Sequence, residues 1–165
     1  MKCTALLPCE KVIIDKDGAH SLINVMQSAA VVLQQQQPNQ SPVNMPVPNN
    51  AIMNMTWWIF SVWKPAIEDV GRSFEQVYQL YLPAGEKFAE HRLPFTQKDD
   101  RMQQTTFYYL GFPVGQEGEL KIRSWLDSEG QRVSDIMETS VRIDHSNSPT
   151  ARTEMFPTNS LSHGS

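Results

Sequence analysis

The stretch "NMTWWIFSVWK", residues Asn54 to Lys64, holds three of the four tryptophans of this 165-residue chain. In a β-strand, successive side chains point to opposite faces of the sheet. Both faces of this strand would be apolar, so the sequence predicts that it is covered on both sides or that its outer face meets another molecule. One face carries Trp57, Ile59, Ser61 and Trp63, and the other carries Trp58, Phe60 and Val62.

Three interpretations of this strand stay open, namely packing in the core, a protein interface and a platform for a sugar or another ligand. Aromatic burial usually means packing, which favours the core. A one-residue shift of register would exchange the two faces. The candidate partner or ligand surface consists of Trp57, Trp58, Phe60 and Trp63, and within it Trp58 and Phe60 are the expected dimer or partner patch.

Three other segments have the pattern of β-hairpins, in which two strand-like runs flank a turn that contains glycine. Glycine adopts the positive φ that such turns need at no steric cost. A further run, "TTFYYLGF", is rich in the β-branched and aromatic residues that favour strands. The hairpin segments are residues 11–25, 76–95 and 120–143, with turns at Gly18, Gly85 and Gly130.

These segments together predict an all-β fold, a two-sheet antiparallel β-sandwich that is immunoglobulin-like or jelly-roll-like and has about eight strands. Helix signals are weak: residues 64–72 could form one or two turns of a connector. We expect one domain over residues 1–145. Residues 34–50, rich in glutamine and proline, are expected to form a long mobile loop, and residues 146–165 a disordered tail.

Composition narrows the functional classes. The formal net charge of -4 gives no broad attraction to phosphate backbones, so we expect no nucleic-acid partner. Cys3 and Cys9 have neither the number nor the spacing of a zinc site or a redox pair. The amino-terminal region lacks the apolar run of a secretion signal, and no segment is long enough to cross a bilayer, which predicts a cytoplasmic protein without membrane contact.

No motif in the sequence predicts catalysis, a cofactor or a metal. The four histidines lie in separate contexts, without a second ligand at helical or strand spacing. The "DKDG" run at residues 15–18 resembles part of a calcium loop, but the position of the required glutamate is taken by Asn24, so it is interpreted as a turn. We therefore expect no catalytic, cofactor-binding or metal-binding residues.

The segments "TALLPCEKVIIDKDGAHSLINVM", "YQLYLPAGEKFAE" and "TTFYYLGFPVGQEGELKIRSWLDSEG" resemble a family of small bacterial proteins described as a domain of unknown function. The resemblance spans residues 4–143. It implies a cytoplasmic β-sandwich, and it implies no chemistry because the family has no assigned activity. The glutamine run, the additional tryptophans and the carboxy-terminal segment depart from the family pattern.

Two functional classes follow. The first is a non-enzymatic accessory or interaction module that binds a protein partner or forms a homodimer. The second is a module for a small ligand, for instance a carbohydrate-binding sandwich, with tryptophan and tyrosine rings stacked on a sugar. The lack of a secretion signal counts against the second class, and a metal-dependent jelly-roll enzyme is a distant third.

Overall fold

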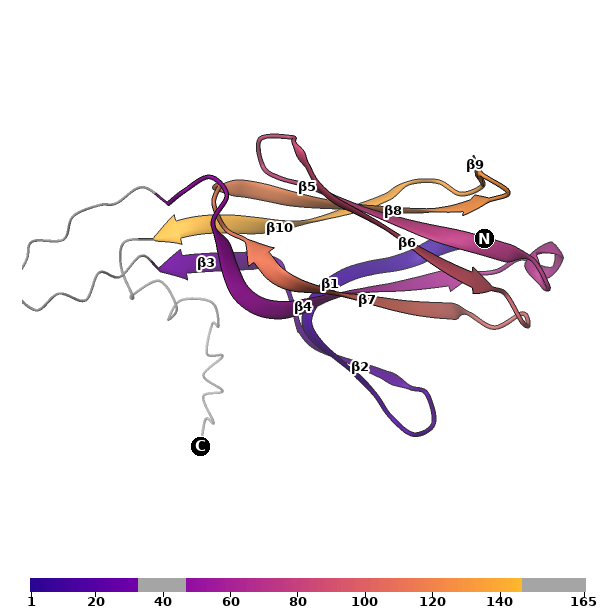
Figure 1. Ribbon diagram of the computed structural model, residues 1–165. Helices are drawn as coiled ribbons and strands as arrows, with labels where there is room; N and C mark the ends of the chain where they lie inside the picture. Colours follow the sequence, from indigo (N-terminus) through magenta and orange to yellow (C-terminus); the bar gives the residue numbers. More distant parts are fainter. Residues whose placement is uncertain (33–46, 147–165) are drawn as a thin grey trace, which may run out of the picture.

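The computed structural model describes residues 1–32 and 47–146. Within them the chain forms two β-sheets that face each other, which confirms the all-β two-sheet sandwich (Figure 1). One sheet has four strands in the order β2-β1-β4-β7, and the other has six, in the order β3-β10-β8-β5-β6 with β9 beside β8. The strands are β1 (Lys2–Ile14), β2 (His20–Val25), β3 (Ser28–Val32), β4 (Ile52–Lys64), β5 (Ser73–Tyr81), β6 (Lys87–Thr96), β7 (Gln103–Pro113), β8 (Gly118–Ser128), β9 (Gln131–Arg132) and β10 (Met137–Ser146).

The three predicted hairpins are present. β1 pairs with β2, β5 pairs with β6, and β8 pairs first with the short β9 at the hairpin tip and then with β10. The turn glycines Gly18, Gly85 and Gly130 have φ angles of 82°, 88° and 75°, in the left-handed region that glycine tolerates best. Each glycine therefore lies where the sequence pattern predicts a reversal of the chain.

Two features of the topology differ from the expectation of about eight antiparallel strands. The described residues form ten strands, and β3 pairs with β10 in parallel. After β2 the chain crosses from one sheet to the other, where the backbone N–H of Arg142 donates to the carbonyl of Gln27 at 3.0 Å. Neither β3 nor β9 has a marked sequence signal, since they contain only five and two residues.

The connector expected at residues 64–72 is a single turn of 3-10 helix, η1 (Ile67–Asp69). The predicted mobile loop at 34–50 lies outside the described residues except for its end, residues 47–50, which includes a turn at Asn49 and Asn50. The predicted disordered tail at 146–165 also lies outside them, apart from the last residue of β10.

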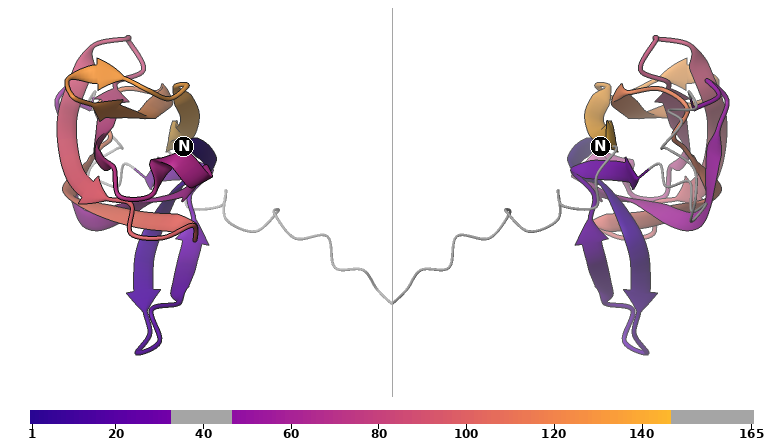
Figure 2. Two further views of the ribbon diagram at one scale, coloured as in Figure 1. Left: turned by 90° about the vertical axis from the view of Figure 1, so that its right-hand side faces the viewer. Right: turned by 90° about the vertical axis from the view of Figure 1, so that its left-hand side faces the viewer.

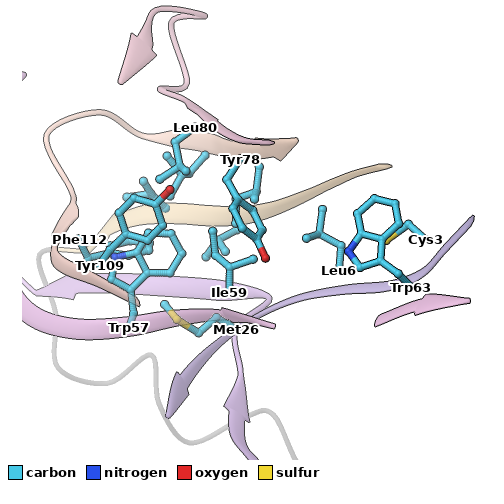
Figure 3. Packing of buried hydrophobic residues seen from close by; sticks show 14 of the residues in the cluster. Cys3, Leu6, Met26, Trp57, Ile59, Trp63, Tyr78, Leu80, Tyr109 and Phe112 are labelled. Carbon is cyan, nitrogen blue, oxygen red and sulfur yellow. The ribbon is translucent and has the colours of Figure 1, made fainter. Parts of the chain in front are cut away.

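The main core fills the space between the sheets, and a smaller apolar cluster lies on the outer side of the four-stranded sheet. Figure 2, which looks at the molecule from the two opposite ends of Figure 1, shows the sheets enclosing this interior, while the β1–β2 hairpin projects from the body. Figure 3 shows Trp57, Ile59 and Trp63 from β4 packed with side chains from the facing sheet, including Tyr78 and Leu80. Strand β4 is therefore central to its own sheet and to the core.

Candidate functional site

The two faces of β4 have separate roles, as the period of two predicts. The side chains of Trp57, Ile59, Ser61 and Trp63 all point inward and are 0% exposed. Trp57 stacks on Tyr109 with ring centroids 4.9 Å apart, and its indole N–H donates to the Gly111 carbonyl at 3.0 Å. Trp57 and Trp63 therefore belong to the core and offer no surface to a partner, although both are in the candidate surface derived from the sequence.

A buried polar cluster lies beside these tryptophans and joins the two sheets. Ser61 of β4 and Thr105 of β7 come from the four-stranded sheet, and Gln76, Tyr78 and Ser124 come from β5 and β8 of the other. The Gln76 amide donates to Ser61 Oγ at 2.8 Å and to Ser124 Oγ at 2.9 Å. Sequence reasoning missed this cluster, and the only local signal is a polar residue on the inner face of each apolar strand.

The donors and acceptors around Thr105 and Ser61 can be assigned. Thr105 donates to Gln76 Oε1 at 2.6 Å, so its oxygen is free to accept from Ser61 at 2.6 Å and from Tyr78 at 3.1 Å. Ser61 in turn accepts from Gln76 and from the indole N–H of Trp63 at 3.2 Å. Burial raises the pKa of Tyr78, which keeps its hydroxyl protonated as a donor. With every group paired, the cluster stabilises the alignment of the two sheets.

The outer face of β4 is only partly covered. Phe60, at 7% exposed, packs with Cys9, Val12 and Leu22 of the β1–β2 hairpin, and the ring centroid of His20 lies 5.5 Å from that of Phe60. The β1–β2 hairpin thus covers this part of the outer face of β4. Phe60 is consequently not available to another molecule in this conformation.

Beyond the hairpin, the outer face carries an apolar surface that we call the β4–β7 patch, made of Trp58, Tyr108 and Leu110. Trp58 and Tyr108 are cross-strand partners with ring centroids 5.3 Å apart and ring planes tilted by 47°. Leu110 follows on the same face of β7. Trp58 is half-buried, whereas Tyr108 is 54% and Leu110 79% exposed.

The outer face of the six-stranded sheet has the opposite character, because it is covered by paired charges. Arg92 of β6 contacts Glu75 at 2.7 Å, Asp127 at 3.1 Å and Glu90 at 3.3 Å. On the neighbouring strands, Arg123 pairs with Glu138 at 2.6 Å. This face is adapted to water.

Glu90 shows the electrostatic effect of that network. Hydrogen bonds from Gln79 and Lys87, together with the Lys87 charge and a hydrogen bond from Arg92, outweigh the opposing effect of burial. They lower the pKa of Glu90 to about 2. The carboxylate is therefore engaged in its own surface network and not poised for acid–base chemistry near neutral pH.

The described residues contain no group of three or more histidine, cysteine, aspartate or glutamate side chains placed to hold a metal ion. Cys3 and Cys9 are free, buried thiols, and burial raises the pKa of Cys3 to about 11 and also raises that of Cys9. The "DKDG" run is a turn in which Asp15 Oδ1 accepts from the backbone N–H groups of Asp17 and Ala19. Over residues 1–32 and 47–146 there is no helix with the length and apolar character needed to cross a membrane.

No protein-family model matches this chain, and no curated protein is significantly similar to it. The resemblance to small bacterial proteins of unknown function therefore stays a prediction. What the chain does is inferred from its two contrasting outer faces.

Proposed function

We propose that this protein is a non-enzymatic interaction module that binds a protein through the β4–β7 patch. The observation that carries the proposal is the contrast between the two outer faces. The outer face of the six-stranded sheet is covered by ion pairs, whereas the outer face of the four-stranded sheet exposes Trp58, Tyr108 and Leu110 side by side. Contiguous apolar surface on one face of a sandwich is typical of a contact surface, while isolated exposed apolar residues need no explanation.

The composition of the patch also fits protein recognition. Tyrosine and tryptophan are enriched in the interface positions that carry most of the binding energy. Full burial of a leucine side chain contributes roughly 1.5 to 3 kcal/mol, and Leu110 has most of its surface still exposed. The patch can therefore supply a binding anchor without any change in the fold.

A small ligand, such as a carbohydrate, is the second candidate. The half-exposed ring of Tyr108 next to Trp58 supports it, since aromatic rings stack on the apolar faces of sugars. The 47° tilt between the two rings favours a protein instead, because the rings do not form one flat platform. Intrinsic tryptophan fluorescence over a panel of sugars distinguishes the two, since only a ligand module gives a saturable shift.

We also propose that this is a bacterial protein and that it is located in the cytoplasm. The two free and buried thiols agree with a reducing compartment, in which cysteines stay unpaired. Fractionation of the source cells under non-reducing conditions tests the proposal. The protein should be recovered from the cytoplasm with both thiols free, and recovery from the periplasm would contradict the proposal.

The binding proposal is tested by affinity capture with matched variants of the tagged protein. The double variant Tyr108→Ser, Leu110→Ser removes the patch, and Ile67→Ser is the control, because Ile67 is as exposed as Leu110 but lies in η1. A protein bound at equal molar ratio by the wild type and by the control, but not by the double variant, supports the proposal. Capture of another protein and capture of an untagged copy of this chain both count as support. Equal binding by all three, or a saturable sugar shift without protein binding, would contradict it.

A further inference from the structure

The edges of the two sheets differ in how well they are protected against pairing with another strand. In the part of the chain that the structure describes, the edge strands are β2, β7, β3 and β6. Natural edge strands avoid pairing by being short, by carrying charges or proline, or by local distortion. Three of the four show such features: β6 carries charged residues and Pro94, β3 has five residues, and β2 has six and contains Asn24 at a φ of 51°.

Strand β7 lacks these protections over most of its length. It has eleven residues and no charged side chain, and its first irregular backbone angle is at Gly111, with a φ of 86°. Among the described strands, only β4 pairs with it, so its other edge has free backbone groups (Figure 1). The side chains beside this edge include Tyr108 and Leu110 of the β4–β7 patch.

We infer that β7 pairs with β7 of a second copy of this chain, in antiparallel orientation about a two-fold axis, to form one continuous sheet of eight strands. The inference rests on the proposed function, because it names the partner of the same surface. Main-chain hydrogen bonds between edge strands provide affinity, and the adjacent side chains provide specificity. A two-fold contact is self-complementary, since the same residues contribute from both copies.

The charge distribution favours a second copy as the occupant. In a two-fold antiparallel pair, a charge near the axis meets the same charge of the other copy, and like charges directly opposite are destabilising. Residues 103–113 contain no charge to create this conflict. The segment that precedes the strand has two positive residues, Lys98 and Arg101, and two negative ones, Asp99 and Asp100, so its formal charge is zero.

The alternation of side chains limits the register. If the outer faces of both copies lie on the same side of the joined sheet, even-numbered residues of one β7 must lie opposite even-numbered residues of the other, because side chains alternate between the two faces along a strand. An axis at Thr106 uses the regular stretch before Gly111 and places Thr106 opposite its own copy. It also places Tyr108 opposite Gln104, and Leu110 opposite Met102, which is 57% exposed in the single chain. This register therefore covers the two most exposed apolar side chains near the edge with each other.

The area of such a contact is sufficient for a weak dimer. Nine paired residues at about 3.4 Å each give a length of about 30 Å, and the edge of one sheet with its side chains gives a width of about 10 Å, since the second sheet takes no part in the pairing. About 300 Å² per copy, or about 600 Å² in total, lies below the roughly 1,200 Å² of standard specific interfaces and within the range of weak, transient contacts. We therefore expect a reversible dimer that dissociates on dilution.

Sedimentation velocity of the purified full chain over a range of concentrations tests this inference. The wild type should show a species of twice the chain mass. Thr106→Lys and Thr106→Glu should each weaken the dimer at least tenfold, because each variant places like charges across the axis. An equimolar mixture of the two should restore the dimer, since opposite charges then meet. Ser21→Lys, on the exposed edge strand β2, is the matched control and should leave the dimer unchanged.

Cross-linking tests the register independently. Residues directly opposite in an antiparallel pair have Cα atoms about 4.5 to 5.5 Å apart, within the range of a disulfide. Thr106→Cys should therefore form a disulfide-linked dimer under mild oxidation, whereas Ser21→Cys should not. The native thiols do not interfere, because Cys3 and Cys9 are buried. Circular dichroism of each variant confirms that it is folded.

A wild type that stays monomeric, or a dimer that persists in both charged variants, would overturn the inference. If both charged variants lose the dimer and mixing them does not restore it, the inference is also overturned. The proposed function fails by a different result, which is capture of a protein that does not depend on Tyr108 and Leu110. If the wild type is monomeric but captures another protein through the β4–β7 patch, the proposed function stands, and the inference that the partner is a second copy of this chain is wrong.

Discussion

The hydrogen-bond cluster between the sheets predicts a large loss of stability in the variant Thr105→Val. Valine keeps the branched shape of threonine but removes the hydroxyl group. In the wild type this hydroxyl donates to Gln76 at 2.6 Å and accepts from Ser61 at 2.6 Å and from Tyr78 at 3.1 Å. The substitution therefore removes three hydrogen bonds from a site with almost no contact with water.

The size of the loss in stability follows from the polar groups that the substitution leaves without a hydrogen-bond partner. Ser61 can turn its proton toward the Tyr78 oxygen, 3.2 Å away, and so recovers one hydrogen bond. Gln76 Oε1 and the Tyr78 O–H have no replacement within the cluster. Each buried group left unpaired costs about 1 to 3 kcal/mol, so the free energy of unfolding should fall by about 2 to 6 kcal/mol. This is a large part of the roughly 5 to 15 kcal/mol that stabilises a typical domain.

Urea unfolding, followed by tryptophan fluorescence and by far-ultraviolet circular dichroism, measures the effect. Thr96→Val is the matched control, because the Thr96 hydroxyl shares one exposed hydrogen bond of 3.0 Å with Ser73. The control should change the free energy of unfolding by no more than about 0.5 kcal/mol. If Thr105→Val were no more destabilising than Thr96→Val, the hydrogen-bond assignment would be wrong.

Three other predictions concern thiols, acid stability and close packing. Cys3 and Cys9 should react with a thiol reagent much more slowly in the folded protein than in urea, because burial raises the pKa of both; fast reaction without denaturant would contradict their placement. Glu90 has a folded-state pKa lowered to about 2, so its contribution to stability is present above the unfolded value of about 4.3 and is lost as pH falls from about 4.3 toward 2. Glu90→Gln should therefore lose less stability than the wild type between pH 5 and pH 2.5 in urea titrations, and equal losses would argue against the ion network. Gly115→Ala would bring its Cβ against the carbonyl oxygen of Asn49, so its thermal midpoint should fall clearly; an unchanged midpoint would contradict this contact.

Local patterns in the sequence were sufficient to predict most of the architecture. The period of two in residues 57–63 assigned Trp57 and Trp63 to one face and Trp58 and Phe60 to the other, and the structure has this division. The turn glycines located the hairpins, because positive φ angles are costly for other residues. The parallel pairing of β3 with β10 was missed, since it joins segments more than 100 residues apart and depends on no local signal.

The candidate site was only partly predictable, because it depends on contacts between distant strands. The sequence grouped Trp58 with Phe60, but the β1–β2 hairpin covers Phe60, and Trp58 instead lies beside Tyr108 of β7. Nothing in either segment fixes that pairing, which spans 50 positions of the chain. The buried cluster around Gln76 was missed for the same reason, since its hydrogen bonds join four strands of two sheets.

Amide hydrogen exchange along the sheet edges tests the central claim most directly, because it shows which part of the molecule is covered in solution. As the protein concentration rises, exchange should slow in β7, over residues 103–110, while the rates in β6 and β2 stay unchanged. Exchange rates in β7 that are independent of concentration, or protection that appears in β6 or β2 instead, would contradict the account.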